Sequence, residues 1–352
     1  MATLRIDSPF PFGKKLRLDN DPVAEIIFNR LTTVIEETAP VFMEKFRKAL
    51  LVAADSSSDI KLKIAVFNKV VKDSHNKIEL DDWRKRKCTA EVAEAIITMV
   101  IFAAKPNYAL LKKTKRINNK GDDYGEINPK QMSSMIRDLE PGPNDVFGDL
   151  GSGIGQFVCF VAAATPVKTS FGIELEPTRA ETAKKFLCLF KRYMKFFGKI
   201  HGRVILETGS IFDQQFRSLI CEEATILFVN NYSFPSEINL QVESDLLKNC
   251  RDGLRIVSTT ELALGARRNT VNGLQRQNLV AMVQKSRVTS IRDGFSWGPT
   301  PVVLTMCTID RTKLQQFEEE QKKRVEKRKR TVTQDSEDKE NLNEPKRGKT
   351  QE

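Results

Sequence analysis

Histidine and tryptophan are both scarce in this chain of 352 residues, with two copies of each. The histidines, His75 and His201, belong to no His-Glu-x-x-His motif. Zinc sites and Ser-His-Asp triads depend on histidine as a metal ligand or as a base, so neither is expected here. We interpret both histidines as surface or capping residues.

The sequence also has no uninterrupted apolar run of the roughly 18 residues that a membrane-spanning helix needs. The opening stretch, MATLRIDSPFPFGKK, lacks the apolar segment of a secretory signal. Six cysteines are scattered at positions 88, 159, 188, 221, 250 and 307, without a Cys-x-x-Cys spacing. We therefore expect an intracellular protein with reduced, mostly buried thiols, no membrane partner and no metal.

Negative charge is in deficit, because 57 Lys and Arg stand against 46 Asp and Glu, which gives a formal net charge of +11. Much of the positive charge lies in three basic runs, at residues 84–87, 112–120 and 322–330. Such runs favour a polyanionic partner, namely nucleic acid, an acidic protein surface or a nuclear-import receptor. The alternative for each single run is a solvated surface or a soluble tail.

The N-terminal part of the chain is predicted to be mainly helical. Residues 1–20 contain Pro9, Pro11 and Gly13 and are expected to be irregular. Apolar residues at helical spacing follow, and they predict helices over residues 22–53, 59–73, 91–104 and 128–139. The basic, glycine-containing segment 112–126 is expected to form a loop.

From residue 145 the pattern changes to alternating strands and helices. The predicted strands cover residues 146–150, 168–173, 203–206, 226–229, 255–257 and 302–308, and the predicted helices cover 157–164 and 177–198. Alternation of this kind indicates a mostly parallel sheet with helices on both faces.

A glycine-rich loop, DLGSGIGQ at residues 149–156, follows the first of these strands and precedes a helix. Gly151, Gly153 and Gly155 allow the backbone to turn sharply and to approach a flat ligand closely. Their GxGxG spacing differs from the GxGxxG spacing of dinucleotide sites, in which a helix N-terminus faces a pyrophosphate.

Two acids accompany the glycine loop. Asp149 lies beside it and suits the positive sulfonium of S-adenosylmethionine better than it suits a pyrophosphate. Glu174 ends the second strand, where a carboxylate can accept both hydroxyls of a ribose. Loop and acids together predict an S-adenosylmethionine site. A nicotinamide or flavin nucleotide, and a tight turn without any ligand, are the alternatives.

Longer motifs around this loop resemble those of the disruptor-of-telomeric-silencing family, which are histone H3 lysine methyltransferases without a SET domain. The similarity extends from about Asn107 to Thr312 and is weaker over the first 100 residues. The motifs that carry it are YGE at 124–126, DLGSGIGQ at 149–156, VAAAT at 161–165, FVNN at 228–231, RIVS at 255–258 and TIDRT at 308–312. The resemblance implies an α/β fold of the class I S-adenosylmethionine-dependent methyltransferase type, with a Rossmann-like, seven-stranded, mostly parallel sheet.

The resemblance also implies roles for individual residues. Those it places around S-adenosyl-L-methionine are Tyr124, Gly125, Glu126, Ile127, Asp149, Gly151, Ser152, Gly153, Gly155, Gln156, Glu174, Ser210 and Ile211. Asn230 corresponds to an asparagine beside the methyl-transfer site, and Tyr232 and Phe234 correspond to aromatic walls of a lysine channel. Arg268 corresponds to an arginine that docks on the acidic patch of the nucleosome.

Several positions depart from the family pattern. Ile127 stands where the cofactor loop usually ends in Thr, and Leu304 stands where a channel Tyr is usual. Ser210 and Ile211 replace the Asp and Phe of a Gly-Asp-Phe motif, so the carboxylate expected at the adenine amino group and the aromatic expected over the ring are missing. Losing such contacts costs about 1–3 kcal/mol, or roughly ten- to hundredfold in cofactor affinity.

Methyl transfer to lysine requires a neutral amine, whereas the pKa of free lysine is about 10.4, so neutrality near physiological pH costs about 4 kcal/mol. A dry aromatic channel and the nearby sulfonium both disfavour the ammonium form. No dedicated base is evident in the sequence, and alignment and exclusion of water would supply the remaining acceleration. Asn230 offers an amide that can orient the amine or the cofactor.

The sequence therefore predicts a nuclear enzyme that methylates a lysine in the globular core of histone H3 within nucleosomes. One alternative, motivated by Ile127, Ser210 and Leu304, is a weak or inactive paralogue that serves as a nucleosome-binding module. Another is a nucleic-acid methyltransferase. The sequence NNYS at 230–233 argues against it, because it lacks the prolines of the Asn-Pro-Pro-Tyr loop common in adenine amino-methylation.

Three segments follow from these patterns. Residues 1–125 are expected to form a helical subdomain with a basic loop, and residues 126–312 the Rossmann-like methyltransferase domain. Residues 313–352 are expected to continue a charged helix, predicted over 311–331, into a disordered basic tail. The tail is expected to bind DNA in a salt-dependent, sequence-independent way, and its basic run could equally serve nuclear import.

Overall fold

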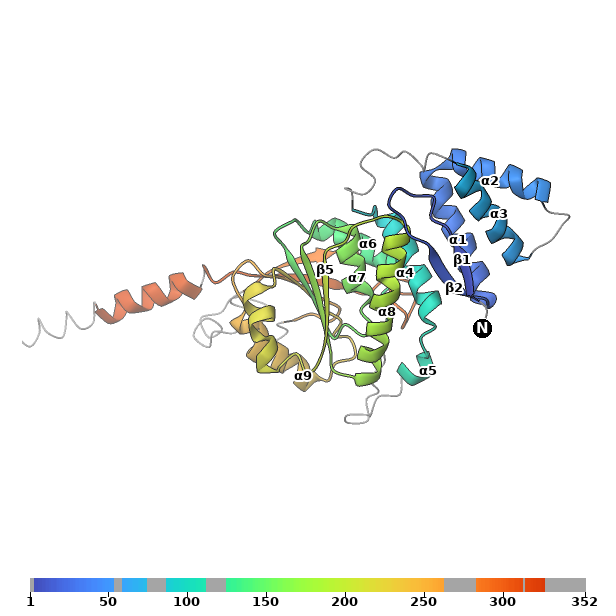
Figure 1. Cartoon of the computed structure of the whole chain (residues 1–352). Coiled ribbons are helices and arrows are strands. Elements are labelled where there is room, and N and C mark those ends of the chain that lie inside the picture. The colour runs from blue at the N-terminus through green and yellow to red at the C-terminus, as the bar shows by residue number, and fades with distance from the viewer. Residues whose placement is uncertain are drawn as a thin grey trace, which may run out of the picture.

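The computed structural model of the chain describes residues 3–53, 59–74, 87–111, 125–262, 283–312 and 314–326 (Figure 1). Tyr124 and Arg268, to which the sequence assigns roles, lie outside these residues. So do the basic run 112–120, most of the run 84–87 and the predicted tail beyond residue 326.

The N-terminal residues form a small hairpin, where the sequence predicted irregular structure. Strands β1 (Thr3–Ile6) and β2 (Leu16–Asp19) pair antiparallel, with Ile6 opposite Leu16. Leu16 and Leu18 are buried while Arg17 and Asp19 point to solvent, which is the alternation of a half-buried strand. Four residues are too short a stretch for this alternation to stand out beside the proline and glycine signals.

Helices follow the hairpin, namely α1 (Pro22–Thr38), α2 (Pro40–Ala53) and α3 (Ile60–Asp73). The single helical stretch predicted over 22–53 is therefore divided. Pro40 causes the break, because it cannot donate a backbone hydrogen bond and disfavours helical geometry at Ala39. Phe28, Phe42, Phe46 and Phe67 hold the three helices together through edge-to-face ring contacts at 5.3–6.2 Å between centroids.

The almost wholly apolar helix α4 (Ala90–Ala104) connects these helices to the rest of the fold. It packs against α1 on one side and against α8 (Pro177–Phe196), α7 (Gln156–Ala164) and α6 (Pro129–Leu139) on the other. The short helix α5 (Tyr108–Leu111) follows it. Because α4 is apolar nearly all round, it must be covered on several sides to be stable.

The central sheet has seven strands in the order β5-β4-β3-β6-β7-β9-β8. Their bounds are β3 (Val146–Leu150), β4 (Thr169–Glu174), β5 (Arg203–Thr208), β6 (Ile226–Val229), β7 (Arg255–Ser258), β8 (Val283–Val288) and β9 (Leu304–Ile309). The strands from β5 to β7 are parallel, and β9 pairs antiparallel with both β7 and β8. This confirms the class I methyltransferase fold expected from the sequence, with β8 as a strand that the sequence did not predict.

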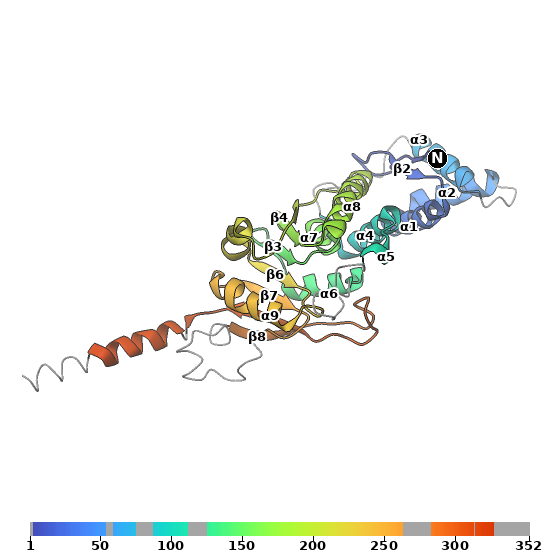
Figure 2. The same cartoon turned by 90° about the horizontal axis from the view of Figure 1, so that it is seen from below.

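Helical segments cover both faces of the sheet (Figure 2). One face carries α7, α8 and, beyond them, α4. The other carries α9 (Ser236–Gln241) and the short turns η1 (Gln214–Phe216), η2 (Ser218–Glu223), η3 (Val242–Leu246) and η4 (Leu247–Asn249). Residues 314–326 are helical and project away from the body (Figure 1), in agreement with the charged helix predicted there.

The strand order fixes where a ligand can bind. From β3 the chain moves to β4 on one side, and it later returns to place β6 on the other. In open α/β sheets such a reversal leaves a crevice at the carboxyl ends of the two central strands. The glycine loop follows β3 directly, so it lies at this crevice.

Candidate functional site

The glycine loop between β3 and α7 has a backbone that only glycine adopts readily. Gly151, Gly153 and Gly155 have φ angles of +85°, +56° and +78°. The N–H groups of Gly151 and Ser152 donate to the carbonyl oxygen of Ile173 at 2.9 and 3.1 Å, which fixes the loop to the end of β4. A Cβ on Gly155 would come within 2.8 Å of Leu206, so this glycine permits close packing of α7 on the sheet.

A cavity of about 760 Å³ opens at this loop. That volume lies within the usual range for small-molecule and cofactor sites. The predicted site residues that line it are Gly125, Glu126, Ile127, Asp149, Gly151, Ser152, Gly153, Gln156, Glu174, Ser210, Ile211, Asn230 and Phe234. Gly155 does not line the cavity; it is the N-cap of α7, and a Cβ at this position would lie next to Leu206 of β5.

Asp149 is the most perturbed acid of the cavity. Burial and, secondarily, the charge of Glu174 raise the pKa of Asp149 to about 8. Its Oδ1 atom is buried and has no hydrogen-bond partner among the described residues, and the same is true of Nε2 of Gln156. Since buried polar groups are nearly always satisfied, this acceptor and this donor indicate a polar ligand in the cavity.

Glu174 ends β4 and is held by backbone groups. Its Oε2 accepts from the N–H of Gly153 and its Oε1 from the N–H of Glu176, both at 2.8 Å. Burial raises the pKa of Glu174, while these hydrogen bonds and the charge of Arg179 oppose the rise. Each carboxylate oxygen has further acceptor capacity, so both can still take a ligand hydroxyl.

The segment 125–128 forms one side of the cavity and is tied to residues 294–296. Ile127 and Phe295 form an isolated antiparallel bridge. The N–H of Glu126 donates to Oγ of Ser296 at 2.9 Å, and the N–H of Ser296 donates back to the carbonyl oxygen of Glu126 at 2.9 Å. The Tyr108 hydroxyl donates to Oε2 of Glu126 at 3.3 Å. The position of this side of the cavity therefore depends on a distant part of the chain.

Asn230 follows β6 and points into the cavity from the opposite side. Its Nδ2 donates to the carbonyl oxygen of Gly125 at 3.4 Å, and its Oδ1 accepts from the hydroxyl of Thr259 at 3.1 Å. The Thr259 oxygen also accepts from the N–H of Tyr232 at 3.0 Å. These contacts orient the Asn230 amide and link the ends of β6 and β7 to the 125–128 segment.

The aromatic residues of the predicted channel separate into two places. Phe234 lines the cavity, with its ring 3.5 Å from the position of a Cβ on Gly151. Tyr232 does not line it, and its side chain is 56% exposed. The Tyr232 ring stacks on Trp297 at 5.2 Å between centroids, and Trp297 also packs on Phe295.

Trp297 is a feature that the sequence analysis missed. A Cβ on Gly125 would lie 2.2 Å from its ring, so the indole covers the start of the 125–128 segment. Tryptophan occurs only twice in the chain, and that rarity was the one available signal. Leu304, predicted as a departure in the channel, is instead buried in the core on β9 and does not line the cavity.

The loop after β5 brings an aromatic into the cavity that the sequence analysis did not expect. Ser210 and Ile211 both line the cavity, and so does Phe212, the next residue. The N–H of Phe212 donates to Oγ of Ser210 at 3.2 Å, and the N–H of Ser210 donates to Oδ2 of Asp213 at 3.0 Å. Other lining residues without a predicted role are Met132, Ile154, Phe157, Ile173, Leu175, Glu176, Pro177, Arg179, Phe228, Ser233, Pro235 and Ile238.

The described residues contain neither a candidate metal site nor a candidate membrane-spanning helix. Nowhere among them do three or more His, Cys, Asp or Glu side chains gather as metal ligands would. Their helices include none that is both long and apolar enough to cross a bilayer. All six cysteines are free thiols, and of these Cys188 alone is exposed.

Known proteins are similar to this chain in sequence. The family model described as "Histone methylation protein DOT1" matches residues 102–309. A Caenorhabditis elegans protein named "Histone-lysine N-methyltransferase, H3 lysine-79 specific" is 34% identical over 335 residues, which cover 92% of this chain and 35% of that protein. The Drosophila melanogaster protein of the same name is 31% identical over 194 residues, which cover 55% of this chain and 10% of that protein. The chain thus spans about a third or less of the length of these relatives.

Among solved structures, an O-methyltransferase from Bacillus cereus in complex with SAH is 13% identical, with a TM-score of 0.38 over 61% of this chain and 91% of that one. A similarity at this level supports no conclusion about function. The family match is different in kind, because it covers more than half of the 352 residues and includes the glycine loop, Asn230 and the whole parallel part of the sheet. The chain belongs to the DOT1 family of histone methylation proteins.

Proposed function

We propose that the protein is an S-adenosylmethionine-dependent lysine N-methyltransferase that acts on a core lysine of histone H3 within nucleosomes. The observation that carries this proposal is the cavity at the switch point of the sheet, which is lined by Asp149, an acid whose Oδ1 is buried and has no partner among the described residues. Family membership and the names of the relatives as H3 lysine-79 specific enzymes support the choice of substrate.

The residues of the cavity fit S-adenosylmethionine. Asp149 can accept from the ammonium of the methionyl part, and Nε2 of Gln156 can donate to its carboxylate. Glu174 can accept from the ribose hydroxyls, and the glycine loop leaves room for the ligand beside the backbone. When bound, the cofactor supplies a methyl group made electrophilic by the sulfonium. A pyrophosphate has no cationic group to match Asp149, so a dinucleotide fits this cavity less well.

The substrate lysine would enter beside Asn230. The amide of Asn230, held by Thr259 and Gly125, can orient the incoming amine. Phe234 within the cavity and the Trp297–Tyr232 stack at its edge can exclude water and disfavour the ammonium form of the lysine. Alignment of the amine with the methyl group then accounts for most of the rate enhancement.

Transfer of labelled methyl from S-adenosylmethionine tests the proposal, with intact nucleosomes, free histone H3 and naked DNA as parallel substrates. We expect label on a core lysine of histone H3, mainly in nucleosomes, located by mass spectrometry. Label in DNA alone would favour the nucleic-acid methyltransferase. Cofactor binding without transfer to any substrate would contradict the proposed activity.

A second candidate is a weak or inactive paralogue that binds nucleosomes. Two departures within the cavity favour it, since Ile127 and Ser210 both line the cavity in place of the usual Thr and Asp. Under this alternative, cofactor binding is undetectable by calorimetry while nucleosome binding persists. Under either proposal, Arg268 is proposed to dock on the acidic patch, and the C-terminal tail, residues 321–352, to contact DNA in the nucleus.

Replacement of Phe212 by Ala tests how the cavity compensates for the missing aromatic at position 211. We propose that Phe212 covers the adenine ring, because it lines the cavity directly after Ile211. Loss of its ring should weaken cofactor affinity by about 1–2 kcal/mol, roughly 5- to 30-fold. Calorimetric titration with S-adenosylmethionine measures this. Ile211→Ala is the matched control and should have the smaller effect; a larger effect of Ile211→Ala would assign the ring contact to Ile211 instead.

A further inference from the structure

Five basic side chains, distant from the cavity, are without an acidic partner in the described part of the chain. They are Lys87, Lys168, Lys191, Lys195 and Arg203, and we call them the α8–β5 basic face. All are exposed except Lys87, which is half-buried. None belongs to any of the ion pairs formed between described residues.

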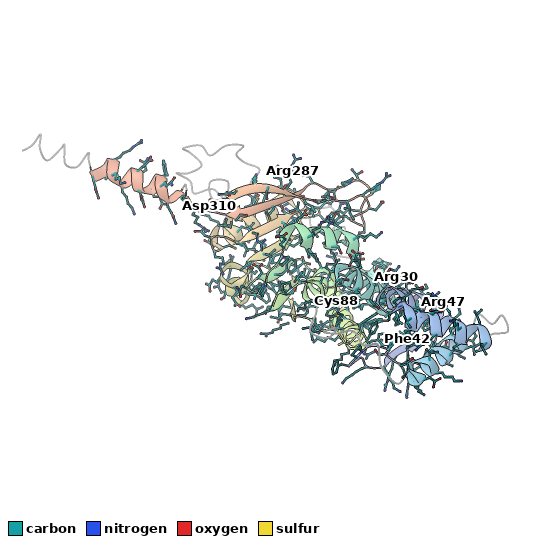
Figure 3. All side chains as sticks on the ribbon, turned by 90° about the horizontal axis from the view of Figure 1, so that it is seen from above. Arg30, Phe42, Arg47, Cys88, Arg287 and Asp310 are labelled. Atoms are coloured by element: carbon teal, nitrogen blue, oxygen red, sulfur yellow. The ribbon has the colours of Figure 1, made fainter. Side chains whose placement is uncertain are left out.

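Backbone contacts bring these side chains together from separate parts of the sequence. Lys87 Nζ and the N–H of Gly202 both donate to the carbonyl oxygen of Ala162, at 3.4 and 2.9 Å. The N–H of Arg203 donates to the carbonyl oxygen of Lys168 at 2.7 Å. Cys88, next to Lys87, is buried, and its N–H donates to the carbonyl oxygen of Ala163 in α7, where the N-terminal helices meet the rest of the body (Figure 3). The cluster therefore follows from the fold and not from a single basic run.

The charges of the face act on His201, whose ring packs on Phe190 of α8 at 5.1 Å between centroids. Burial lowers the pKa of His201, and the positive charges of Lys87, Lys191 and Lys195 lower it further. Residues 182–206 contain seven Lys or Arg and no Asp or Glu. The like charges of Lys87, Lys191 and Lys195 repel one another, and a polyanion would relieve that repulsion.

The face and the cavity lie at opposite ends of α8. Pro177 and Arg179, in the first turn of the helix, line the cavity, whereas Lys191 and Lys195 lie in its C-terminal half. A helix of 20 residues is about 30 Å long, at about 1.5 Å per residue. A partner bound to the face thus leaves the cavity open. The N–H of Lys14 donates to the carbonyl oxygen of Lys195 at 2.9 Å, so the N-terminal hairpin borders the same surface.

We propose that the α8–β5 basic face binds the backbone phosphates of double-stranded DNA without recognising sequence. The proposal rests on the proposed function only in that a nucleosomal substrate would bring DNA within reach. Lysine predominates in the face, and Lys binds phosphate as a point charge. Protein–protein interfaces, in contrast, are depleted in Lys and enriched in Arg and aromatic residues. None of the residues of this face belongs to the C-terminal tail, to which non-specific DNA binding was assigned from the sequence.

The test is binding of the full chain to a naked DNA duplex across a range of salt concentrations, without histone and without cofactor. The double variant Lys191→Gln/Lys195→Gln removes two exposed charges from the face, and Lys61→Gln/Lys69→Gln removes two exposed charges from α3, which lies apart from α8 in both views (Figures 1 and 2). Each lost phosphate contact makes the slope of log K against log salt shallower by about 0.9. The ratio of wild-type affinity to that of the α8 variant should therefore fall about 3- to 12-fold when salt is raised from 50 to 200 mM.

The control variant should keep the wild-type slope and affinity to within about twofold, because Lys61 and Lys69 do not belong to the face. Any contribution of the tail is the same in all three proteins. Equal slopes for the α8 variant and the wild type would overturn the proposal. So would unchanged DNA binding together with weaker binding to an isolated H2A–H2B dimer, because the face would then serve an acidic protein surface. Failure of methyl transfer would leave this assay unaffected.

Discussion

Asp149→Asn should weaken binding of S-adenosylmethionine about 10- to 100-fold while the protein remains folded. The substitution keeps the size of the side chain but removes the negative charge that faces the cavity. A hydrogen bond to a charged group contributes about 1.5–3 kcal/mol, which corresponds to that loss of affinity. Calorimetric titration at pH 8 measures it, since the pKa of Asp149 in the ligand-free protein is about 8 and the carboxylate is then substantially ionised.

The same variant should change how stability depends on pH. Folding raises the pKa of Asp149 to about 8 from an ordinary value of 3.8, so the unfolded chain releases this proton at lower pH than the native protein does. The free energy of unfolding of the ligand-free wild type therefore falls as pH rises from about 4 to about 8, by up to about 4 kcal/mol at pH 7 from this group. Asn cannot titrate, and the difference in unfolding free energy between the two proteins should change with pH accordingly.

Asp145→Asn is the matched control. Asp145 accepts from the N–H of Gly142, from the hydroxyl of Thr225 and from Arg255, at 2.7, 2.6 and 3.1 Å, and it does not line the cavity. This variant should lose stability and keep its cofactor affinity. If the two variants lose cofactor affinity equally, Asp149 acts through the fold and does not touch the cofactor.

Asn230→Ala should lower kcat for methyl transfer about 100-fold and leave cofactor affinity within about threefold. The Asn230 amide is oriented from two sides, by the Thr259 hydroxyl and the Gly125 carbonyl oxygen. Misplacement of reacting groups by about 1 Å can cost about 100-fold in rate, even when binding is retained. Single-turnover transfer to nucleosomes, with calorimetry of the cofactor alongside, separates the two effects.

Two substitutions of Thr259 show whether orientation of the amide is what matters. Thr259→Val removes the hydroxyl that donates to Oδ1 of Asn230 and accepts from the N–H of Tyr232, so kcat should fall. Thr259→Ser keeps the hydroxyl and should restore most of the rate.

If Asn230→Ala retains wild-type kcat, the proposed role of Asn230 is wrong, and Phe234 and Trp297 remain as the groups that position the lysine.

The glycine loop and the parallel strands could be predicted because their signals are local. Gly151, Gly153 and Gly155 occupy backbone conformations that few other residues adopt, and each parallel strand is a short apolar run bounded by turns. Strand β8 was missed, because QKSRV is polar and its strand character comes from pairing with β9 across the sheet edge. Trp297 and Phe212 could not be assigned to the site, because long-range packing decides which way a loop side chain points.

The position of α4 affects how cooperatively the protein unfolds. One continuous hydrophobic cluster contains Ile6 of the N-terminal hairpin, Ile97 of α4 and Leu304 of the last strand. Partial opening of the N-terminal helices would expose the apolar surface of α4, so the described residues should unfold largely as one unit. A cut at residue 125, the boundary suggested by the sequence, would then divide a common core. The floor of the cavity therefore depends for its rigidity on residues that never touch a ligand.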